Sequence, residues 1–535
     1  MIRVSSVPLR VKQVPEDFTA FVAELTGWTN IKSVTIVKKS VDARKKTNLH
    51  LEYSFDVEID GDEEEALKNS LYRNIAPLQP YPVYRALTSK PLSPRPIVVG
   101  TGPAGIMAAL ALAEAGANPL VIERGKNVSR RRKDVERLWK IGELNENSNV
   151  QFGEGGAGTF SDGKLNTGIK KDSLTRKVLT EFIAAGAPPE ILYEGKPHIG
   201  TDKLGRVVTN IRRKILSLGG EYRFETRLTD IIVKDGAIKA VQVVNAAGEI
   251  EEIAATRVIL AIGHSARDTF EMLYNRGVKM IQKPFAVGVR IEHLQSFINK
   301  SRYGMVKPKA LLGAADYKLA VHMDNGRGVY SFCMCPGGTV VAAASEAGRV
   351  ATNGMSFYAR DGVNANSALL VDVKPEEDFE TDHPLAGVEF QRKIEENAFR
   401  AGGGLFKAPV QKAMDFIEGR ETTEFGEVLP TYRPGVSFAD MRAVLPPVIA
   451  ETLRLGFRKL NRKIYEFSKH DALLTGAETR SSSPVRILRD PNCCESVNVS
   501  GLYPCGEGAG YAGGIVSAAA DGLRCAAHVI VKENT

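Results

Sequence analysis

A glycine-rich segment near residue 100 has the residue types and spacing of a phosphate-binding turn. Residues 97–105 read Ile-Val-Val-Gly-Thr-Gly-Pro-Ala-Gly, an apolar strand that runs directly into closely spaced glycines. The first glycine permits a tight turn, the second lets the backbone approach a pyrophosphate, and the third lets the following helix pack on the sheet. The free N–H groups at the start of that helix face the phosphates. The predicted contacts are Gly100, Gly102, Pro103, Ala104 and Gly105.

An acidic residue stands where such a turn needs one. The predicted helix of residues 106–115 is followed by a strand, 119–122, and then by Glu123 and Arg124. A carboxylate at this position accepts the ribose hydroxyls and rejects a 2′-phosphate. The site is therefore predicted to bind FAD or NAD rather than NADP, with Glu123 on the ribose and Arg124 as a further cofactor contact.

Later segments favour FAD over NAD. A strand over 256–263 follows an antiparallel meander, and a second strand, predicted over 497–503, leads into a Gly-Glu pair. Both resemble the closing parts of the FAD domain in the glutathione-reductase-like superfamily, where the acidic residue holds the ribityl chain. The helix that follows aims its positive end at the flavin and stabilises its reduced form. The predicted flavin contacts here are Gly263, Gly506, Glu507, Gly513, Gly514 and Ile515.

Another glycine-rich stretch, residues 152–163, does not lie between a strand and a periodic helix. It is predicted to be a loop whose backbone packs against the flavin or the pyrophosphate, and a flexible surface loop is the alternative. The sequence has no second nucleotide fingerprint, so no nicotinamide domain is predicted. If NAD(P)H donates electrons, it docks transiently in the substrate cleft. The predicted loop contacts are Gly155, Gly156, Gly158 and Thr159.

Taken together, these motifs resemble a family of uncharacterised bacterial FAD-dependent proteins, the NAD(FAD)-utilising dehydrogenases. The resemblance covers nearly the whole chain. It implies bound FAD and a fused N-terminal module, but it names no substrate. The segments that carry the resemblance are 153–163, 283–288, 331–338, 352–355, 479–484 and 506–522.

No motif identifies catalytic residues, so the candidates are cysteines and histidines. Cys333 and Cys335 lie in a predicted strand, where period two puts both side chains on one face as a redox dithiol or as two core residues. Their α-carbons would be about 6.6 Å apart, which strains a disulfide and favours the core interpretation. His198 and His293 are the histidines predicted to face a substrate cleft.

Composition limits the class of protein. The chain has 535 residues, of which 43% are hydrophobic and 25% charged, as in globular proteins of two or three domains. No apolar run suits a secretory signal or a membrane span, and the six cysteines show no disulfide pattern, so a cytoplasmic protein is expected. Cys493 and Cys494 have no partner at zinc-site spacing, and no metal site is predicted.

The net charge of +8 raises the question of a nucleic-acid partner. The densest basic run, residues 130–133, is followed by Asp134 and Glu136 and has no interleaved aromatic residues. It is therefore interpreted as a solvated helix face. We expect a small-molecule substrate, no nucleic acid and no membrane span, and the sequence leaves the oligomeric state open.

The order of elements predicts an α/β protein in four segments. Residues 1–88 form a small N-terminal α+β module before a proline-rich linker. Residues 95–270 and 475–535 form a Rossmann-type FAD-binding domain, into which an α+β substrate or cap domain, 271–474, is inserted. The predicted function is an FAD-dependent oxidoreductase that moves hydride between a small molecule and flavin N5. Two alternatives stay open: a flavin-dependent RNA-modifying enzyme, and a non-catalytic redox sensor or partner-binding module.

Overall fold

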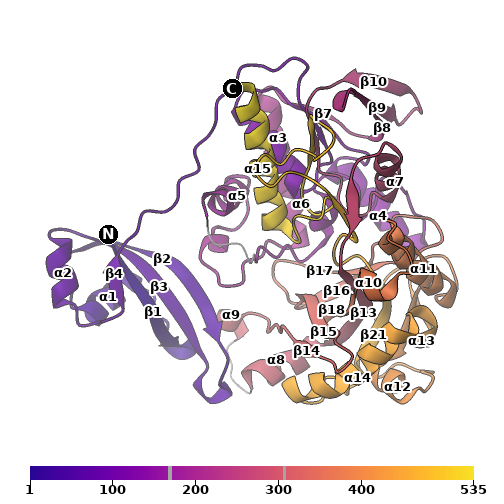
Figure 1. The fold of residues 1–535 in the computed structure, drawn as a ribbon. Helices are drawn as coiled ribbons and strands as arrows, with labels where there is room; N and C mark the ends of the chain where they lie inside the picture. The colour runs from indigo at the N-terminus through magenta and orange to yellow at the C-terminus, as the bar shows by residue number, and fades with distance from the viewer. Residues whose placement is uncertain (167–171, 305–308, 535) are drawn as a thin grey trace.

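The computed structural model describes residues 1–166, 172–304 and 309–534. A small N-terminal module, joined by an extended linker, lies beside a large main body (Figure 1). The main body combines a parallel nucleotide-binding sheet with a mixed sheet of the cap. The α/β class with an inserted cap and a small N-terminal module is as predicted.

The N-terminal module is a four-stranded antiparallel sheet, in the order β2-β3-β1-β4, with helices packed on it. Alternate strand residues such as Val4, Phe55 and Val57 are fully buried, as the period of a strand requires. Helix α1 begins after Asp17, whose carboxylate accepts two backbone N–H groups of the first turn. The elements are β1 (Ile2–Arg10), η1 (Val11–Gln13), α1 (Phe18–Thr26), β2 (Ile31–Asp42), η2 (Lys46–Asn48), β3 (His50–Ile59), α2 (Glu63–Asn69) and β4 (Ile75–Pro77).

The nucleotide-binding sheet has five parallel strands in the order β23-β11-β5-β6-β7. Its central strands are short, and three of them are fully apolar and buried, as expected for a sheet covered on both faces. The strands are β5 (Ile97–Val99), β6 (Leu120–Ile122), β7 (Glu221–Arg223), β11 (Val258–Leu260) and β23 (Leu502–Pro504). The strands of the antiparallel meander are β8 (Thr226–Lys234), β9 (Ala237–Asn245) and β10 (Ile250–Ala254).

Helices α3 and α15, which are about 400 residues apart in the sequence, pack together beside the nucleotide-binding sheet (Figure 1). Gly522 of α15 allows this, because a Cβ there would lie 2.1 Å from Ala104 O. The helices of this half are α3 (Pro103–Glu114), α4 (Val128–Ile141), η3 (Gly156–Phe160), α5 (Ser173–Ala184), η4 (Pro189–Leu192), α6 (Thr201–Ser217), α7 (Arg267–Asn275) and α15 (Ile515–Asn534).

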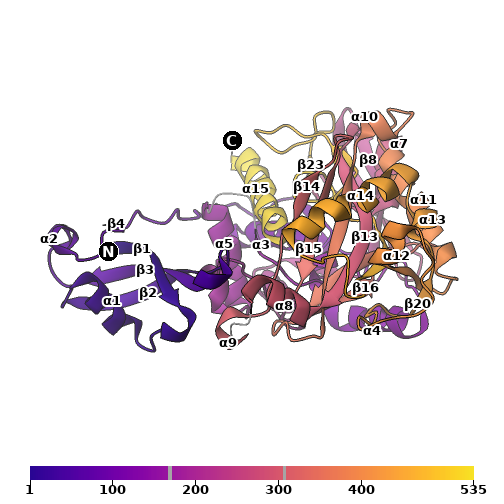
Figure 2. The ribbon, with the colours of Figure 1, turned by 90° about the horizontal axis from the view of Figure 1, so that it is seen from below.

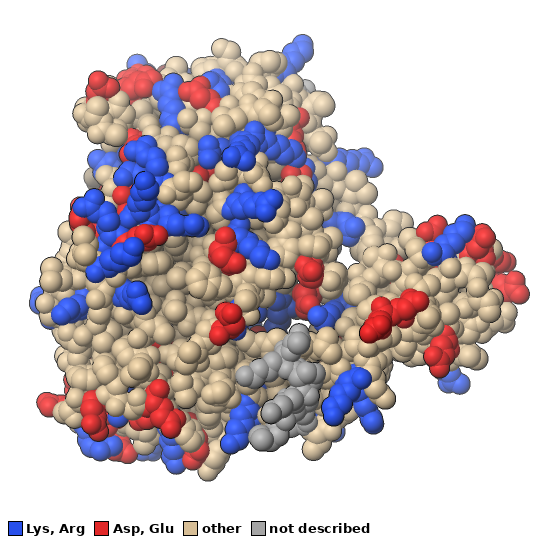
Figure 3. Space-filling model, turned by 180° about the vertical axis from the view of Figure 1, so that it is seen from behind, with Lys and Arg blue, Asp and Glu red and all other residues tan. Residues whose placement is uncertain are grey.

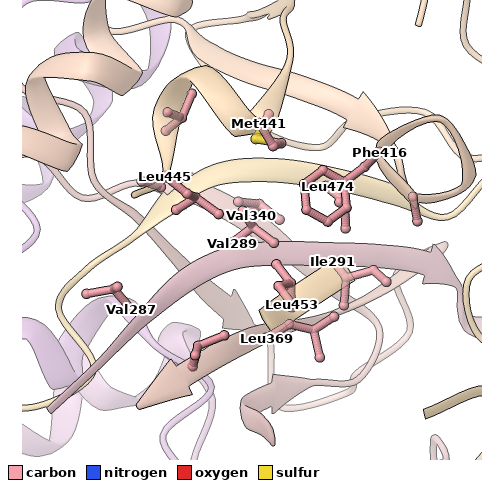
Figure 4. Close-up of a cluster of buried hydrophobic side chains, with 14 of the residues drawn as sticks. Val287, Val289, Ile291, Val340, Leu369, Phe416, Met441, Leu445, Leu453 and Leu474 are labelled. Atoms are coloured by element: carbon pink, nitrogen blue, oxygen red, sulfur yellow. The ribbon is translucent and has the colours of Figure 1, made fainter. Parts of the chain in front are cut away.

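The cap is built on a seven-stranded sheet in the order β14-β15-β18-β13-β21-β19-β20. Its central strand β13 is buried over nine of ten residues, because elements cover both of its faces. Figure 4 shows the apolar core around it, in which Val289, Ile291 and Leu474 pack against Leu453 and Phe416. The strands are β13 (Phe285–Leu294), β14 (Ala320–His322), β15 (Gly328–Cys335), β18 (Asn364–Val373), β19 (Ala408–Lys412), β20 (Val436–Phe438) and β21 (Leu473–Glu478).

Two small antiparallel ribbons and seven further helices lie among the described residues between Met280 and Ile487. The ribbon strands are β12 (Met280–Gln282) with β22 (Val485–Ile487), and β16 (Gly338–Ala342) with β17 (Thr352–Ser356). The helices are α8 (Gln295–Tyr303), α9 (Lys309–Leu312), α10 (Pro375–Asp378), α11 (Ala386–Ala401), α12 (Ala413–Glu418), α13 (Met441–Val444) and α14 (Pro447–Lys463). Among the residues that the structure describes, no helix has the length and apolar character needed to span a membrane.

Two local predictions need correction. The strand expected over 497–503 begins only at Leu502, because Gly501 has φ +82° and interrupts it. Strict alternation also fails in β15, where the pairing with β18 shifts between Phe332 and Cys335 and Cys333 has φ +43°. This β-bulge interrupts the regular strand at the two cysteines, of which Cys333 is exposed and Cys335 is buried.

Candidate functional site

A pocket of about 660 Å³ runs from the nucleotide-binding sheet to the cap. At one end it is lined by residues that follow β5, β6 and β11, at the carboxyl ends of these parallel strands. At the other end it is lined by residues of β15, β17 and β21 of the cap. Crevices at the carboxyl ends of parallel strands are the usual ligand sites of such sheets.

The turn after β5 has the geometry that its glycines predict. Gly100 has φ +97°, and a Cβ there would lie 2.4 Å from Ala261 O. A Cβ on Gly105 would lie 1.9 Å from Gly100 O, so only glycine lets α3 pack this closely. Gly102 is the N-cap of α3 and has no side-chain cap, and a Cβ there would meet no atom within 4 Å. The first turn of α3 therefore offers free N–H groups beside open space.

Glu123 lies at the end of β6 and lines the pocket. Its Oε2 accepts hydrogen bonds from Thr101 N at 3.0 Å and from Thr101 Oγ1 at 2.5 Å. Its Oε1 accepts from Gly125 N at 2.8 Å and from Gly153 N at 3.0 Å. The carboxylate is thus fixed by the turn after β5 and by the loop of residues 152–163, which we call the glycine-rich loop.

Arg131 holds the glycine-rich loop from behind. It is fully buried, and its guanidinium donates five hydrogen bonds of 2.7 to 3.2 Å to backbone carbonyls between Asn149 and Gly156. Burial lowers the pKa of Arg131 to about 10, so it stays charged at neutral pH. The interpretation of the run 130–133 as a solvated face is therefore wrong for this residue, because its donors have replaced water with carbonyl oxygens.

The glycine-rich loop is also anchored through Glu154. Its carboxylate accepts from Val128 N at 2.8 Å and from Arg212 Nε at 2.6 Å, so it ties the start of α4 to α6. Gly155 allows a tight approach of Thr159, whose Oγ1 donates to Glu154 O at 3.2 Å. The loop is therefore held by buried polar contacts, unlike the flexible surface loop that was the alternative.

The segment after β23 is held by α15. Gly506 N donates to Asp521 Oδ2 at 2.8 Å, and Asp521 in turn pairs with Arg489 at 2.7 Å. Glu507 faces the pocket and contacts His264, with 2.8 Å between Oε1 and Nδ1. His264 follows β11 and also lines the pocket, so its contact with Glu507 joins two parts of the same wall.

Most of the predicted cofactor residues lie in the pocket wall. Four do not line it and instead shape the wall from behind: Gly105, Gly155, Thr159 and Gly506. The predicted residues that line the pocket are Gly100, Gly102, Pro103, Ala104, Glu123, Arg124, Gly156, Gly158, Gly263, Glu507, Gly513, Gly514 and Ile515.

The cap contributes a charged pair that the sequence did not reveal. Glu478, at the end of β21, lines the pocket and is only 4% exposed. Its Oε1 accepts from Arg290 Nη1 at 2.8 Å and its Oε2 from Thr352 Oγ1 at 3.2 Å. Burial raises the pKa of the Glu478 carboxyl above its ordinary value. Glu478 directly precedes the segment 479–484, which carries part of the family resemblance, and this position could have indicated it from the sequence.

Cys333 and Cys335 both line this end of the pocket. Cys335 is buried and its thiol donates to Cys333 O at 3.2 Å. The side chain of Cys333 is exposed, but the surface that it exposes is the pocket wall inside the molecule. The surrounding protein still raises the pKa of Cys333 to about 12, so the thiol is protonated at neutral pH.

Neither histidine candidate is among the described residues that line the pocket. His293 is buried in the cap core, where its Nε2 contacts Phe467 O at 2.7 Å. His198 stacks on Tyr358 at 5.2 Å between ring centroids, and its Nε2 contacts Tyr358 O at 3.0 Å. Both rings are therefore engaged in packing away from the pocket.

The fold brings Cys505, Asp521 and Cys525 together, with ligand atoms within 4.8 Å of one another. The spacing of the cysteines gave no hint of this group. The Arg489 guanidinium already occupies the place of a cation there, because it pairs with both oxygens of Asp521 and lies 3.4 Å from Cys525 Sγ. The group is better explained as the anchor of Gly506 than as a metal site.

Comparisons with known proteins identify the family. Residues 284–481 match the family described as FAD-dependent protein, C-terminal domain-like, and residues 95–134 match an FAD binding domain. Residues 1–58 match a domain of unknown function, DUF8436. An uncharacterized protein from Clostridium beijerinckii is 50% identical over 506 residues, 94% of this chain and 93% of that protein. The chain belongs to a family of FAD-dependent proteins.

Solved flavoprotein structures resemble this family member in part. A variant of E. coli quinol fumarate reductase FrdA is 12% identical, with a TM-score of 0.38 over 84% of this chain and 71% of that chain. A glycine oxidase from Bacillus cereus is 11% identical, with a TM-score of 0.32 over 82% of this chain and 94% of that chain. At these identities the likeness concerns the fold alone.

The pocket of this family member fits FAD. Open space lies next to Gly102, Gly263 and Gly513, where an added Cβ would meet no heavy atom within 4 Å. The free N-terminus of α3 suits a pyrophosphate, and the Glu123 carboxylate at the end of β6 suits a ribose.

Proposed function

We propose that the protein is an FAD-dependent oxidoreductase that oxidises a small molecule bound between the flavin and the cap wall. Bound FAD supplies a hydride acceptor at N5. The strand order β23-β11-β5-β6-β7 and the paired glycine-rich segments support a place in the glutathione-reductase-like superfamily. The observation that carries the proposal is that the cap presents an ionisable carboxyl, Glu478, to the same pocket as the nucleotide turn.

Glu478 is the pocket carboxyl best suited to accept a proton. Burial alone would raise the pKa of Asp162, but Lys164 and Arg360 outweigh it and hold that pKa low. Asp316 is paired with Lys196, Glu507 with His264, and Glu123 accepts four hydrogen bonds. A raised pKa brings a base closer to neutral pH, where general-base catalysis is most effective.

These groups suit a substrate with a C–H bond next to an O–H or N–H group. The C–H bond breaks with its electron pair leaving as hydride, and the proton of the O–H or N–H group goes to Glu478. The substrate becomes a carbonyl or an imine, because it loses one hydride, which carries both electrons, and one proton. Arg290 and Thr352 hold the carboxylate in place during this transfer.

A second molecule must exchange electrons with the flavin to complete the catalytic cycle. We propose that the nicotinamide couple is this transient partner at the same pocket, since the chain shows one nucleotide fingerprint. NAD(P)⁺ takes the two electrons from the flavin that the substrate has reduced, and NAD(P)H donates them in the reverse direction. An anaerobic spectral titration of the yellow protein with NADH and with NADPH tests this. Bleaching of the flavin band by either nucleotide supports the proposal, and a flavin that neither reduces argues for a different donor.

The alternatives find less support. An RNA-binding surface needs unpaired basic residues, yet Arg131 is buried, Arg130 pairs with Glu225 and Lys140 pairs with Glu136. On the face shown in Figure 3, acidic side chains lie among the basic ones of the main body. A redox sensor needs a reactive thiolate, and the raised pKa of Cys333 works against one.

A further inference from the structure

The N-terminal module contacts the main body at two of the segments that line the pocket. We define the mouth of the pocket as Asn166, Lys196, Asp316 and Lys318, lining residues of which Asp316 is half-buried and the other three are exposed. Lys196 and Asp316 face each other there, with 2.6 Å between Nζ and Oδ1. The positions of Lys196 and Asp316 therefore set the width of the mouth.

One side of the mouth is held by strand pairing with the module. Lys39, in β2, donates its N–H to Tyr193 O at 2.7 Å and accepts from Gly195 N at 2.7 Å. This pairing forms a parallel β-bridge with Glu194, to which Lys39 Nζ also pairs at 2.8 Å. Lys196 follows directly, so β2 fixes the backbone next to it.

The other side of the mouth is held by burial in the module. Leu312, at the end of α9, is only 6% exposed and belongs to the hydrophobic core of the module. Tyr303 of α8 packs against the same core and donates its OH to Leu312 O at 3.4 Å. Asp316 lies four residues after Leu312. Figures 1 and 2 both show the end of the module's sheet next to α8 and α9.

We propose that the N-terminal module holds both sides of the mouth and thereby sets which molecules reach the cap end of the pocket. An exposed ion pair such as that of Lys196 and Asp316 is weak by itself. Its geometry depends on the two docked segments, because each carries one partner. When the module is displaced, both segments lose their anchor and the mouth widens. The inference rests on the proposed function in one respect, that the flavin occupies the pocket.

Gly195 gives a selective way to weaken the docking. It has no positive φ, and the three heavy atoms nearest to an added Cβ all belong to β2, the first being Ser40 Cβ at 2.8 Å. Gly195→Ala therefore strains the contact with the module alone. Ser40→Gly removes the clashing atom, so the double variant restores the fit. Lys38→Ala is the matched control, because Lys38 pairs with Glu52 inside the module.

Access to the bound flavin is measured in the full-length holoprotein by acrylamide quenching of flavin fluorescence. Gly195→Ala is expected to raise the quenching constant by a factor of about two or more, as the loss of a closing element does. The double variant and Lys38→Ala are expected to match the wild type. Leu312→Asp, which breaks the docking on the other side, is expected to raise the constant as well.

Two results would overturn the proposal. One is a quenching constant that stays at the wild-type value in both Gly195→Ala and Leu312→Asp. The other is a rise in Gly195→Ala that Ser40→Gly fails to reverse. A wild-type protein that purifies without flavin would instead count against the proposed function, so the two failures are distinguishable.

Discussion

Glu478 combines exposure to the pocket with burial from solvent. Its oxygens accept from Arg290 and Thr352, which favours the charged form, but burial is the larger effect and raises the pKa above its ordinary value of 4.5. The base form therefore predominates only above this raised pKa. As the pH falls through it, Glu478 takes up a proton and can no longer accept one from a substrate.

The ionisation of Glu478 should be visible in the flavin spectrum. In the wild type we expect the visible absorbance of the oxidised flavin to shift as the pH rises through the raised pKa, since a charge forms next to the ring. Glu478→Gln should abolish the shift. Glu271→Gln should leave it in place, because Glu271 pairs with Arg392 and is not among the described residues that line the pocket. A wild-type spectrum that is flat with pH would place Glu478 away from the flavin.

Glu123 links the cofactor to the turn that binds it. Glu123→Ala removes charge-assisted hydrogen bonds worth roughly 1.5 to 3 kcal/mol and leaves the N–H groups of Gly125 and Gly153 without this acceptor. We expect FAD to be lost in part during dialysis, measured as the ratio of flavin to protein absorbance. Full retention after dilution and dialysis would show that the ribose does not depend on this carboxylate.

Among the structural elements, the glycine-rich loop and α4 act as one unit. Helix α4 buries Val128, Arg131, Val135 and Leu138, which recur at helical spacing along one face. That periodicity was present in the sequence and marks Arg131 as an inward residue. The run 130–133 was nevertheless interpreted as solvated, because the neighbours of Arg131 are charged. The carbonyls that Arg131 binds lie in a loop without periodicity, so the partner of Arg131 could not be predicted.

Arg131→Met should therefore release the loop. Several buried carbonyls would lose their donor, so we expect a loss of at least about 3 kcal/mol in the free energy of unfolding and weaker FAD binding. Urea denaturation and fluorimetric titration with FAD measure the two effects. The matched control is Arg132→Met, on the exposed side of α4, which should behave as wild type. If the two variants bind FAD equally well, Arg131 does not shape the site.

Other elements differ in how far the sequence determines them. The turn at Gly100 and the acidic end of β6 follow from a local pattern, because the glycine spacing and the acidic residue lie within one continuous strand-turn-helix-strand segment. The bulge at Cys333 depends on the pairing of β15 with β18, a long-range contact that alternation cannot predict. Glu478 and Arg290 meet for the same reason, since β13 and β21 are far apart in the sequence.

In the whole molecule, a buried ion cluster joins the FAD domain to the cap. Arg267 of α7 and Arg480 both pair with Glu395 of α11, at 2.8 and 3.1 Å, and Glu395 is fully buried. Burial alone would raise the pKa of Glu395, but the two arginines outweigh it and hold the pKa well below 4.5. The stability that this carboxylate provides is present above its unfolded pKa and is lost as the pH falls through the folded value.

Glu395→Gln should consequently destabilise the protein by about 3 to 5 kcal/mol at neutral pH, because it removes the fully buried carboxylate that both arginines share and leaves the partly exposed Glu346 as the remaining acidic partner of Arg267. Urea unfolding curves at pH 7 measure the change. Glu396→Gln is the control, since Glu396 pairs with Arg349 near the surface. Equal midpoints for the two variants would show that the cluster does not hold the domains together.

We propose one FAD per chain as the redox centre of the protein, with Cys333 and Cys335 as residues of the pocket wall. The most direct test is an anaerobic dithionite titration of the purified protein, read at the flavin band. We predict a yellow protein with one FAD per chain that takes up two electrons, and the same count after Cys333 and Cys335 are both replaced by serine. A colourless protein would contradict the account, and so would four electrons in the wild type that fall to two in the double variant.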